Sequence, residues 1–81
     1  RLILSRAQSA LARGKPEKAL EALEEHADSF SEGKLVEERK ALEIRALVQA
    51  GRKKEARRRA KAFLEAYPNS IFTDLVKTAL P

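Results

Sequence analysis

The 81-residue sequence contains no cysteine and few of the residues that interrupt helices. Without cysteine it can form no disulfide, no thiolate metal site and no cysteine nucleophile, and the absence fits a reducing or an oxidising compartment equally well. Only three glycines, three prolines, three phenylalanines and one tyrosine stand beside abundant alanine, leucine, glutamate, lysine and arginine. This composition favours helices over strands. We therefore expect an all-α fold.

Signals for membrane targeting are also missing. The sequence has no signal peptide and no run of roughly 18 apolar residues, so we expect no direct membrane insertion by this part of the protein. Eighty-one residues make one small domain with a modest core, which buries only about 60 to 65% of the surface of the unfolded chain. Because the chain starts at Arg1 and continues at once with three aliphatic residues, it reads as a fragment of a larger protein.

The residue sets that usually carry out catalysis are not recognisable. The sequence has no glycine-rich phosphate loop, and its serines stand without an identifiable histidine and orienting third group. His26 is the only histidine, and the nearby carboxylates fall on a different strip of the predicted helix, so we expect it to pack at the edge of the core. We therefore predict a non-enzymatic protein without catalytic residues, cofactor or bound metal.

The positive evidence begins with an internal repeat. Four landmarks recur 37 residues apart, namely Gly14 and Gly51, Ala19 and Ala56, Phe30 and Tyr67, and Gly33 and Ser70. A repeat of this length in a helix-forming sequence is typical of stacked helix hairpins. Such arrays usually bind partners.

Hydrophobic periodicity predicts five helices. The first covers about Leu2–Arg13, the second opens at Pro16, and the third covers about Lys34–Ala50. Gly14 and Gly51 follow the first and third helices as C-caps. The fourth helix ends before Pro68, and Ser70 is predicted to cap a fifth helix over about 70–80.

The spacing of Gly51, Ala56 and Pro68 resembles the glycine, alanine and proline landmarks of tetratricopeptide repeats, and Gly14 with Ala19 resembles the same pair one repeat earlier. The resemblance implies one domain over 1–81, with repeat one at about 1–33, repeat two at about 34–69 and a capping helix at about 70–80. Together they would form an α-α superhelix of two tandem helix-turn-helix repeats. The chain departs from the family pattern in its 37-residue spacing and in the first-helix aromatic and glycine positions, and Ser31 replaces a closing proline.

A narrower likeness concerns the location of the protein. The longer spacing, together with the segment 67–70, is similar to the repeats of bacterial cell-envelope proteins. It favours the periplasm slightly over the cytoplasm. Compartment and partner otherwise stay open.

In tetratricopeptide repeats, the first helix of each repeat lines a concave face that binds a peptide or protein. Transferring those positions predicts a partner-binding groove lined by Leu4, Gln8, Leu11, Ala12, Ala41, Arg45, Val48 and Gln49. A lining of apolar and polar residues suits an extended or helical peptide, and Arg45 is available to a carboxylate. The alternative is that the apolar members pack against an adjacent repeat or domain.

The positive charge is concentrated in the second half of the chain. Residues 1–44 carry 8 basic and 9 acidic side chains, whereas residues 45–81 carry 9 basic and 3 acidic ones. The basic patch consists of Arg52, Lys53, Lys54, Arg57, Arg58, Arg59 and Lys61. It raises the alternative of a nucleic-acid-binding module. On a helical wheel, however, the charges spread around the polar arc and no exposed aromatic residue is interleaved, so a solubilising face or an acidic protein partner is favoured.

Two charged rows occupy equivalent positions in the two repeats. Glu17, Glu21 and Glu24 shift by the repeat length onto Lys54, Arg58 and Lys61. These rows are expected to face water and to attract one another across the surface, with about 0 to 1 kcal/mol for each exposed pair. The same polarity predicts salt-dependent head-to-tail contacts between chains.

The predicted fifth helix has an apolar arc wider than one neighbour needs. Its candidate self-association residues are Phe72, Leu75, Val76 and Leu80. Terminal repeats normally carry a polar outer face, so we expect this end to be covered by the rest of the protein or by a second copy in a homodimer. A structural, self-associating role is therefore a second alternative.

Overall fold

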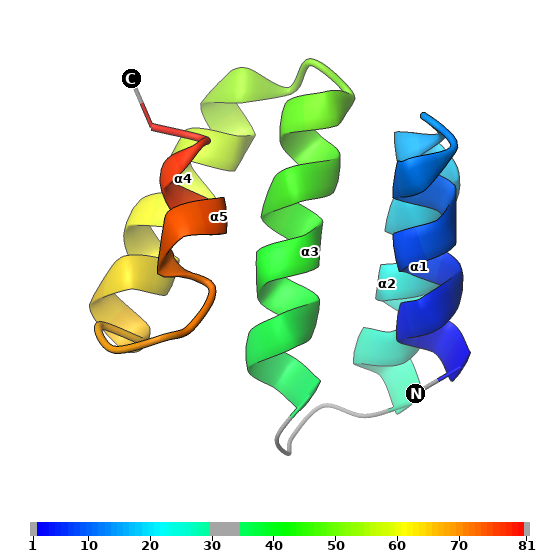
Figure 1. The fold of residues 1–81 in the computed structure, drawn as a ribbon, viewed down its shortest axis with the longest axis horizontal. Coiled ribbons are helices and arrows are strands. Elements are labelled where there is room, and N and C mark those ends of the chain that lie inside the picture. Colours follow the sequence, from blue (N-terminus) through cyan, green and yellow to red (C-terminus); the bar gives the residue numbers. More distant parts are fainter. Residues whose placement is uncertain (1, 30–34, 81) are drawn as a thin grey trace.

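The computed structural model describes residues 2–29 and 35–80, which contain five helices and no strand. The helices are α1 (Leu2–Ala12), α2 (Pro16–Ser29), α3 (Leu35–Gln49), α4 (Lys53–Ala66) and α5 (Thr73–Lys77) (Figure 1). The predicted all-α fold class is confirmed in these two segments. The predicted landmarks Phe30, Ser31 and Gly33 lie outside the described residues.

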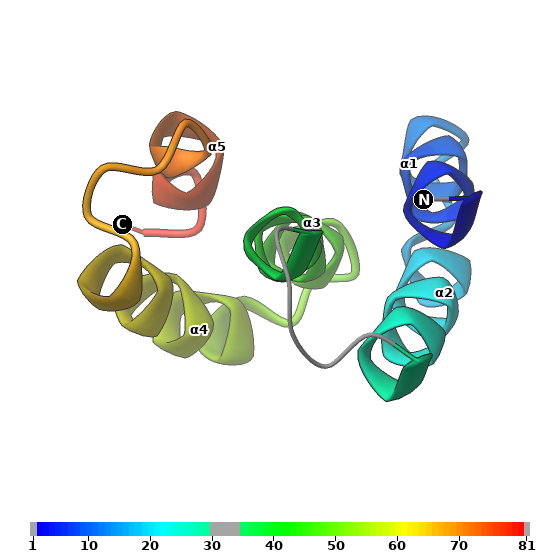
Figure 2. The ribbon, with the colours of Figure 1, turned by 90° about the horizontal axis from the view of Figure 1, so that it is seen from below.

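The helices form an open array of hairpins. α1 packs on α2 and α3 on α4, while α3 stands in the middle and also contacts α1, α2 and α5. In residues 2–29 and 35–80, the backbones of α1 and α2 do not approach those of α4 and α5. Figure 2 shows α1 and α5 on one side of the array, α2 and α4 on the other, and α3 between the two pairs. This arrangement differs from a closed four-helix bundle, in which the first and fourth helices would meet.

The two hairpins turn in the same way. Gly14 and Gly51 both have left-handed backbone, with φ of 70° and 82°, which glycine adopts without the steric penalty of a Cβ. After α1, the Lys15 N–H donates to the Ala10 carbonyl at 2.8 Å, and after α3 the Arg52 N–H donates to the Leu47 carbonyl at 2.9 Å. Both helices therefore end in Schellman caps whose atoms are related by the 37-residue shift.

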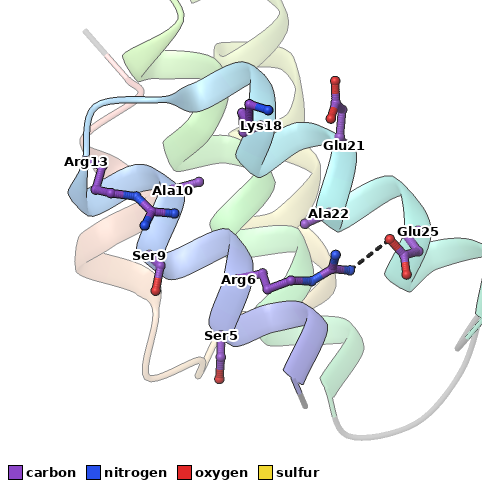
Figure 3. A pocket seen from close by; sticks show the side chains of 9 residues that line it. All are labelled: Ser5, Arg6, Ser9, Ala10, Arg13, Lys18, Glu21, Ala22 and Glu25. Atoms are coloured by element: carbon purple, nitrogen blue, oxygen red, sulfur yellow. Dashed lines mark hydrogen bonds and ion pairs between the residues drawn. The ribbon is translucent and has the colours of Figure 1, made fainter.

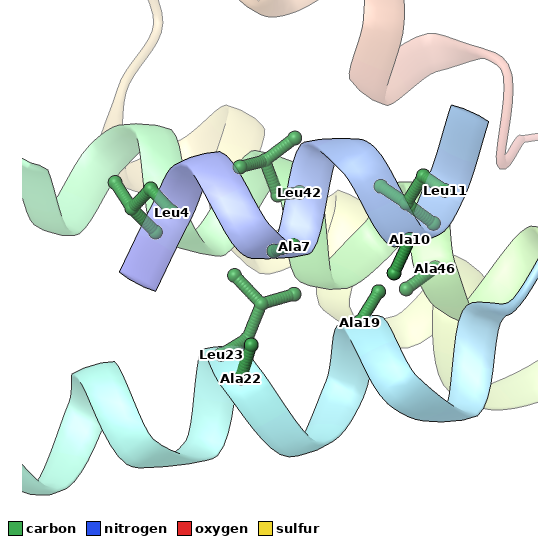
Figure 4. Close-up of a cluster of buried hydrophobic side chains, with 9 residues drawn as sticks. All are labelled: Leu4, Ala7, Ala10, Leu11, Ala19, Ala22, Leu23, Leu42 and Ala46. Carbon is green, nitrogen blue, oxygen red and sulfur yellow. The ribbon is translucent and has the colours of Figure 1, made fainter. Parts of the chain in front are cut away.

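The first hairpin has a closed core. Its buried side chains come from α1, α2 and the facing side of α3, and they are Leu4, Ala7, Ala10, Leu11, Ala19, Ala22, Leu23, Leu42 and Ala46 (Figure 4). Alanines on α1 and α2 allow these two helices to approach closely, and the leucines fill the space between them and α3. Removing this apolar surface from water stabilises the hairpin at roughly 25 cal/mol per Å².

The second core, around α3, α4 and α5, is more open. Its buried members are Ala41, Ile44, Ala60, Phe63 and Val76. Six further apolar residues pack around them while only partly buried, and these are Leu64, Tyr67, Phe72, Leu75, Ala79 and Leu80. The second hairpin therefore leaves much of its apolar surface near solvent.

The fifth helix is shorter than the predicted span of about 70–80. Ser70 acts in the preceding turn, where its Oγ accepts the Phe72 N–H at 3.0 Å and its carbonyl accepts the Thr73 hydroxyl at 2.8 Å. The Ser70 hydroxyl also donates to Glu37 of α3, which ties the turn to the middle helix. After Lys77 the backbone continues with i→i−3 hydrogen bonds as far as Leu80. Local hydrogen bonds on both sides thus limit α5 to Thr73–Lys77.

None of the helices in the described segments is long and apolar enough to cross a membrane.

Candidate functional site

The predicted groove residues divide into a buried and an accessible group. Leu4 and Leu11 lie in the first core and Ala41 lies in the second, each at most 2% exposed. Their prediction as lining residues is therefore wrong for this chain. The reason is that α3 packs against both α1 and α5. These apolar residues of α1 and α3 are therefore buried between helices.

The accessible members mark one face of the array, which we call the α1/α3/α5 face. Gln8, Ala12, Arg45 and Gln49 are exposed, and Val48 is half-buried. The Gln8 side-chain amide donates to Glu38 at 3.1 Å, and that of Gln49 donates to the Leu11 carbonyl at 3.2 Å. Both bonds join α1 to α3.

Arg45 is the distinctive charge of this face. It is exposed on α3, one helical turn after Ala41 and Leu42, which are buried in the second and the first core respectively. Among the residues described, no carboxylate forms an ion pair with it. Its guanidinium can therefore take a carboxylate from outside the chain in a bidentate geometry.

All seven residues of the predicted basic patch are exposed, but two of them are neutralised within the chain. Arg52 pairs with Glu17 at 3.4 Å. Arg59 pairs with Glu43 and Glu55, both at 3.1 Å. The other five make no ion pair in the described segments, so the patch is less positive than its composition suggests.

In the described segments no ion pair joins the acidic row of α2 to the basic row of α4. The two helices are held apart by α3, and their backbones make no contact among the described residues. The ion pair that crosses from one hairpin to the other uses Arg52, at the start of the second hairpin's outer helix, and Glu17. Lys54, Arg58 and Lys61 stay available on the outer surface of α4.

A small cleft between α3 and α4 holds a partly buried carboxyl. Its volume is about 320 Å³, and its lining includes Ile44, Phe63 and Glu43. Burial raises the pKa of Glu43, while the charges of Arg59 and Arg39 oppose this shift. Glu43 is the one carboxyl among the described residues that line the cleft, and its shortest ion pair is with Arg59. Its geometry therefore fits a link between α3 and α4.

His26 is fully buried between α2 and α3, deeper than predicted. Burial lowers its pKa, and the positive charge of Arg39 lowers it further, against a smaller opposing effect of Glu38. Phe63, at the equivalent position of the second hairpin, is also buried. In the described segments no group of three or more histidines and carboxylates could hold a metal ion. His26 thus has the packing role of an aromatic core residue.

The predicted self-association residues differ in accessibility. Val76 is fully buried, which excludes it from a contact surface, whereas Phe72, Leu75 and Leu80 are half-buried. The predicted fifth-helix span of about 70–80 also includes Ile71, but α5 begins only at Thr73. Ile71 lies in the turn before α5 and is 88% exposed.

A larger hollow was not anticipated from sequence. It measures about 630 Å³ and lies on the outer side of the α1/α2 hairpin, away from α3 (Figure 3). Ala10 and Ala22 form its floor, and an ion pair of 2.8 Å between Arg6 and Glu25 crosses it. In the sequence, the feature that corresponds to this hollow is the set of small residues on α1 and α2 that line it.

Comparison with protein-family models, curated proteins and solved structures finds no match to this chain.

Proposed function

We propose that this chain is a non-enzymatic protein interaction module that binds a carboxylate-bearing peptide segment on its α1/α3/α5 face. The observation that carries the proposal is the exposed Arg45 at the middle of this face, without a carboxylate partner in the described segments. The resemblance to tetratricopeptide repeats, from which these positions were predicted, favours the same face.

The residues around Arg45 suit a peptide backbone. Gln8 and Gln49 place amide groups on the face, and each has hydrogen-bonding capacity beyond its one bond to the neighbouring helix. Half-buried Val48 adds apolar surface beside them. A peptide would thus meet a charge that orients it, amides that pair with its backbone and one apolar contact.

Peptide selection followed by nuclear magnetic resonance tests the proposal. A random peptide library is displayed against the immobilised chain, and enriched peptides are titrated into ¹⁵N-labelled protein. We expect enrichment of Asp and Glu, with the largest amide shifts at Arg45, Val48 and Gln49. Arg45→Glu should weaken binding about tenfold or more, since it replaces a charge-assisted contact by repulsion.

Arg58→Glu is the matched control, because Arg58 is an exposed arginine of α4 that makes no ion pair in the described segments. It changes the net charge by the same amount and should leave binding nearly unchanged. The proposal fails if no peptide is enriched, if the shifts map to α2 and α4, or if the two variants weaken binding equally. Equal loss would indicate general electrostatic attraction to a basic chain.

A further inference from the structure

The two ends of the helix array have complementary shapes. One end is the outer side of the α1/α2 hairpin, with the hollow of about 630 Å³ over Ala10 and Ala22. The other end is formed by α4, α5 and the turn between them, which lies opposite the α1/α2 hairpin in Figure 2. From this turn projects Ile71, which is 88% exposed. One end therefore offers an apolar side chain and the other a depression with a floor of small residues.

The outer helices at these ends carry opposite charge. α2 has five acidic residues and one lysine, whereas α4 has six basic residues and two acidic ones. The two described segments show the same contrast. Residues 2–29 carry four basic and five acidic side chains, whereas residues 35–80 carry eleven basic and six acidic ones. Opposite charges on two surfaces steer and orient their encounter.

The inner helices at these ends are also compatible. α1 contributes Arg6 and Arg13 to the rim of the hollow, and α5 carries exposed Asp74 beside exposed Lys77. Glu21 and Glu25 form the α2 side of the same rim, together with Lys18. If a second chain extends the helix array of the first, α4 of one chain lies beside α2 of the other, and α5 lies beside α1. Glu21 of α2 then faces α4, and Arg13 of α1, which makes no ion pair in the described segments, faces Asp74.

We propose that a second copy of this chain occupies the α1/α2 hollow, docking head to tail with its Ile71 on the small-residue floor. The contact joins two different surfaces, so each copy keeps one free end and association continues into short open chains. It leaves the α1/α3/α5 face accessible, and the proposal is independent of peptide binding there.

Sedimentation velocity on end-blocked variants tests the arrangement. Ile71→Asp removes the apolar side chain at one end, and Ser9→Trp fills the hollow at the other. Both residues are exposed, so neither change disturbs a core. At low salt and high concentration the unchanged protein should exceed its 9.1 kDa monomer mass, and each variant alone should remain near that mass. Ile71→Asp should raise the dissociation constant about tenfold or more.

Mixing the two variants gives the decisive result. Each retains one intact end, so an equal mixture should form a 1:1 dimer that grows no further. Association of the unchanged protein should weaken at high ionic strength, because the charges are screened. Ile71→Val keeps an apolar side chain and should associate like the unchanged protein. Circular dichroism of each variant checks that its helix content is retained, and Ser5→Arg, also on the hollow, replaces Ser9→Trp if needed.

Three results would overturn the proposal. The first is an unchanged protein that stays monomeric at low salt and high concentration. The second is a folded Ile71→Asp or hollow-blocking variant that associates as well as the unchanged protein. The third is a hollow-blocked variant that dimerises alone, because this would show that two α4/α5 ends pair with each other in a symmetric dimer.

Discussion

The two hairpins share a backbone plan but not the same degree of closure. Both turn through a left-handed glycine with equivalent hydrogen bonds, and both bury an alanine, Ala19 or Ala56, at the start of the second helix. The core around the first hairpin has nine buried described residues, two of them from α3, and three partly exposed apolar neighbours, whereas the core of the second has five buried and six partly exposed. A repeated backbone thus does not imply a repeated core, because closure depends on what covers each hairpin.

The difference arises from the middle helix and from α5. The first hairpin is covered by the whole length of α3, whose Leu42 and Ala46 complete its core. The second hairpin is covered on its far side by α5, which has only five residues and contributes one fully buried side chain, Val76. The chain therefore has a well-packed end and a sparsely covered one.

The largest expected effect contrasts the two cores directly. Leu23→Ala in the closed core should lower the free energy of unfolding by about 3 kcal/mol, because it leaves a cavity where the side chain was fully buried. Leu64→Ala in the open core should cost only about 1 kcal/mol, since Leu64 is already half-exposed. Urea denaturation of both variants measures the difference. Equal losses would contradict the contrast in packing.

The glycine caps should respond alike. Gly14→Ala and Gly51→Ala each force a residue with a Cβ into left-handed backbone, at a cost of about 1 to 2 kcal/mol. At both positions the added Cβ has no atom of the described residues within 4 Å, so the backbone conformation sets the penalty. Thermal unfolding of the two variants should therefore show similar decreases, with Asn at either position costing less. A loss at only one glycine would refute the equivalence of the caps.

The stability of the protein should depend on pH through His26, a titratable residue of the first hairpin where the second has Phe63. The lowered pKa of His26 means that the unfolded chain binds a proton more readily than the folded one. Its stabilising contribution is complete above the ordinary pKa of 6.5 and is lost as the pH falls from there toward the lowered folded-state pKa. For this one group, the free energy of unfolding can change by at most about 1.4 kcal/mol per pH unit.

His26→Phe supplies the residue that the second hairpin has at this position and should flatten that part of the pH profile. Urea unfolding at a series of pH values from neutral to mildly acidic compares the two proteins. An unchanged slope in the variant would show that other groups, such as the carboxylates, cause the acid sensitivity.

The smallest effect concerns the ion pair between the hairpins. Arg52 and Glu17 are both largely exposed and 3.4 Å apart, so a double-mutant cycle with Arg52→Ala and Glu17→Ala should give a coupling of about 0 to 1 kcal/mol. The coupling should decline with added salt. A larger, salt-resistant value would mean that this pair holds the hairpins together more than its exposure suggests.

The helices, their order and the turns were predictable because they depend on local properties. Alanine and leucine at helical spacing, Gly14 and Gly51 after the helices and Pro16 at a first position each act within a few residues. The length of α5 was not predictable in this way. The Ser70 turn uses the side chain as well as the backbone, and its hydroxyl is also bonded to Glu37, more than thirty residues earlier.

The candidate surfaces were predictable only in part. Arg45, Gln8 and Gln49 are accessible as expected, since polar residues on the outer arc of a packed helix remain in water. Leu4, Leu11 and Ala41 were assigned to the same face, but periodicity cannot tell an apolar residue that faces a partner from one that faces the next helix. Ile71 and the hollow beside Ala10 lie at the two ends of the array. The hydrophobic period within each helix does not predict which residues are exposed at such an end.

By itself, the sequence determined that the chain is helical, that two hairpins turn at equivalent glycines, and that positive charge gathers on α4, because these are local consequences of residue type and spacing. Only the tertiary structure decided which apolar side chains are buried between helices. It also decided that α3 separates the acidic row of α2 from the basic row of α4, and that Ile71 projects from one end. Such features depend on contacts between residues far apart in the chain, where each helix competes for the same apolar surface.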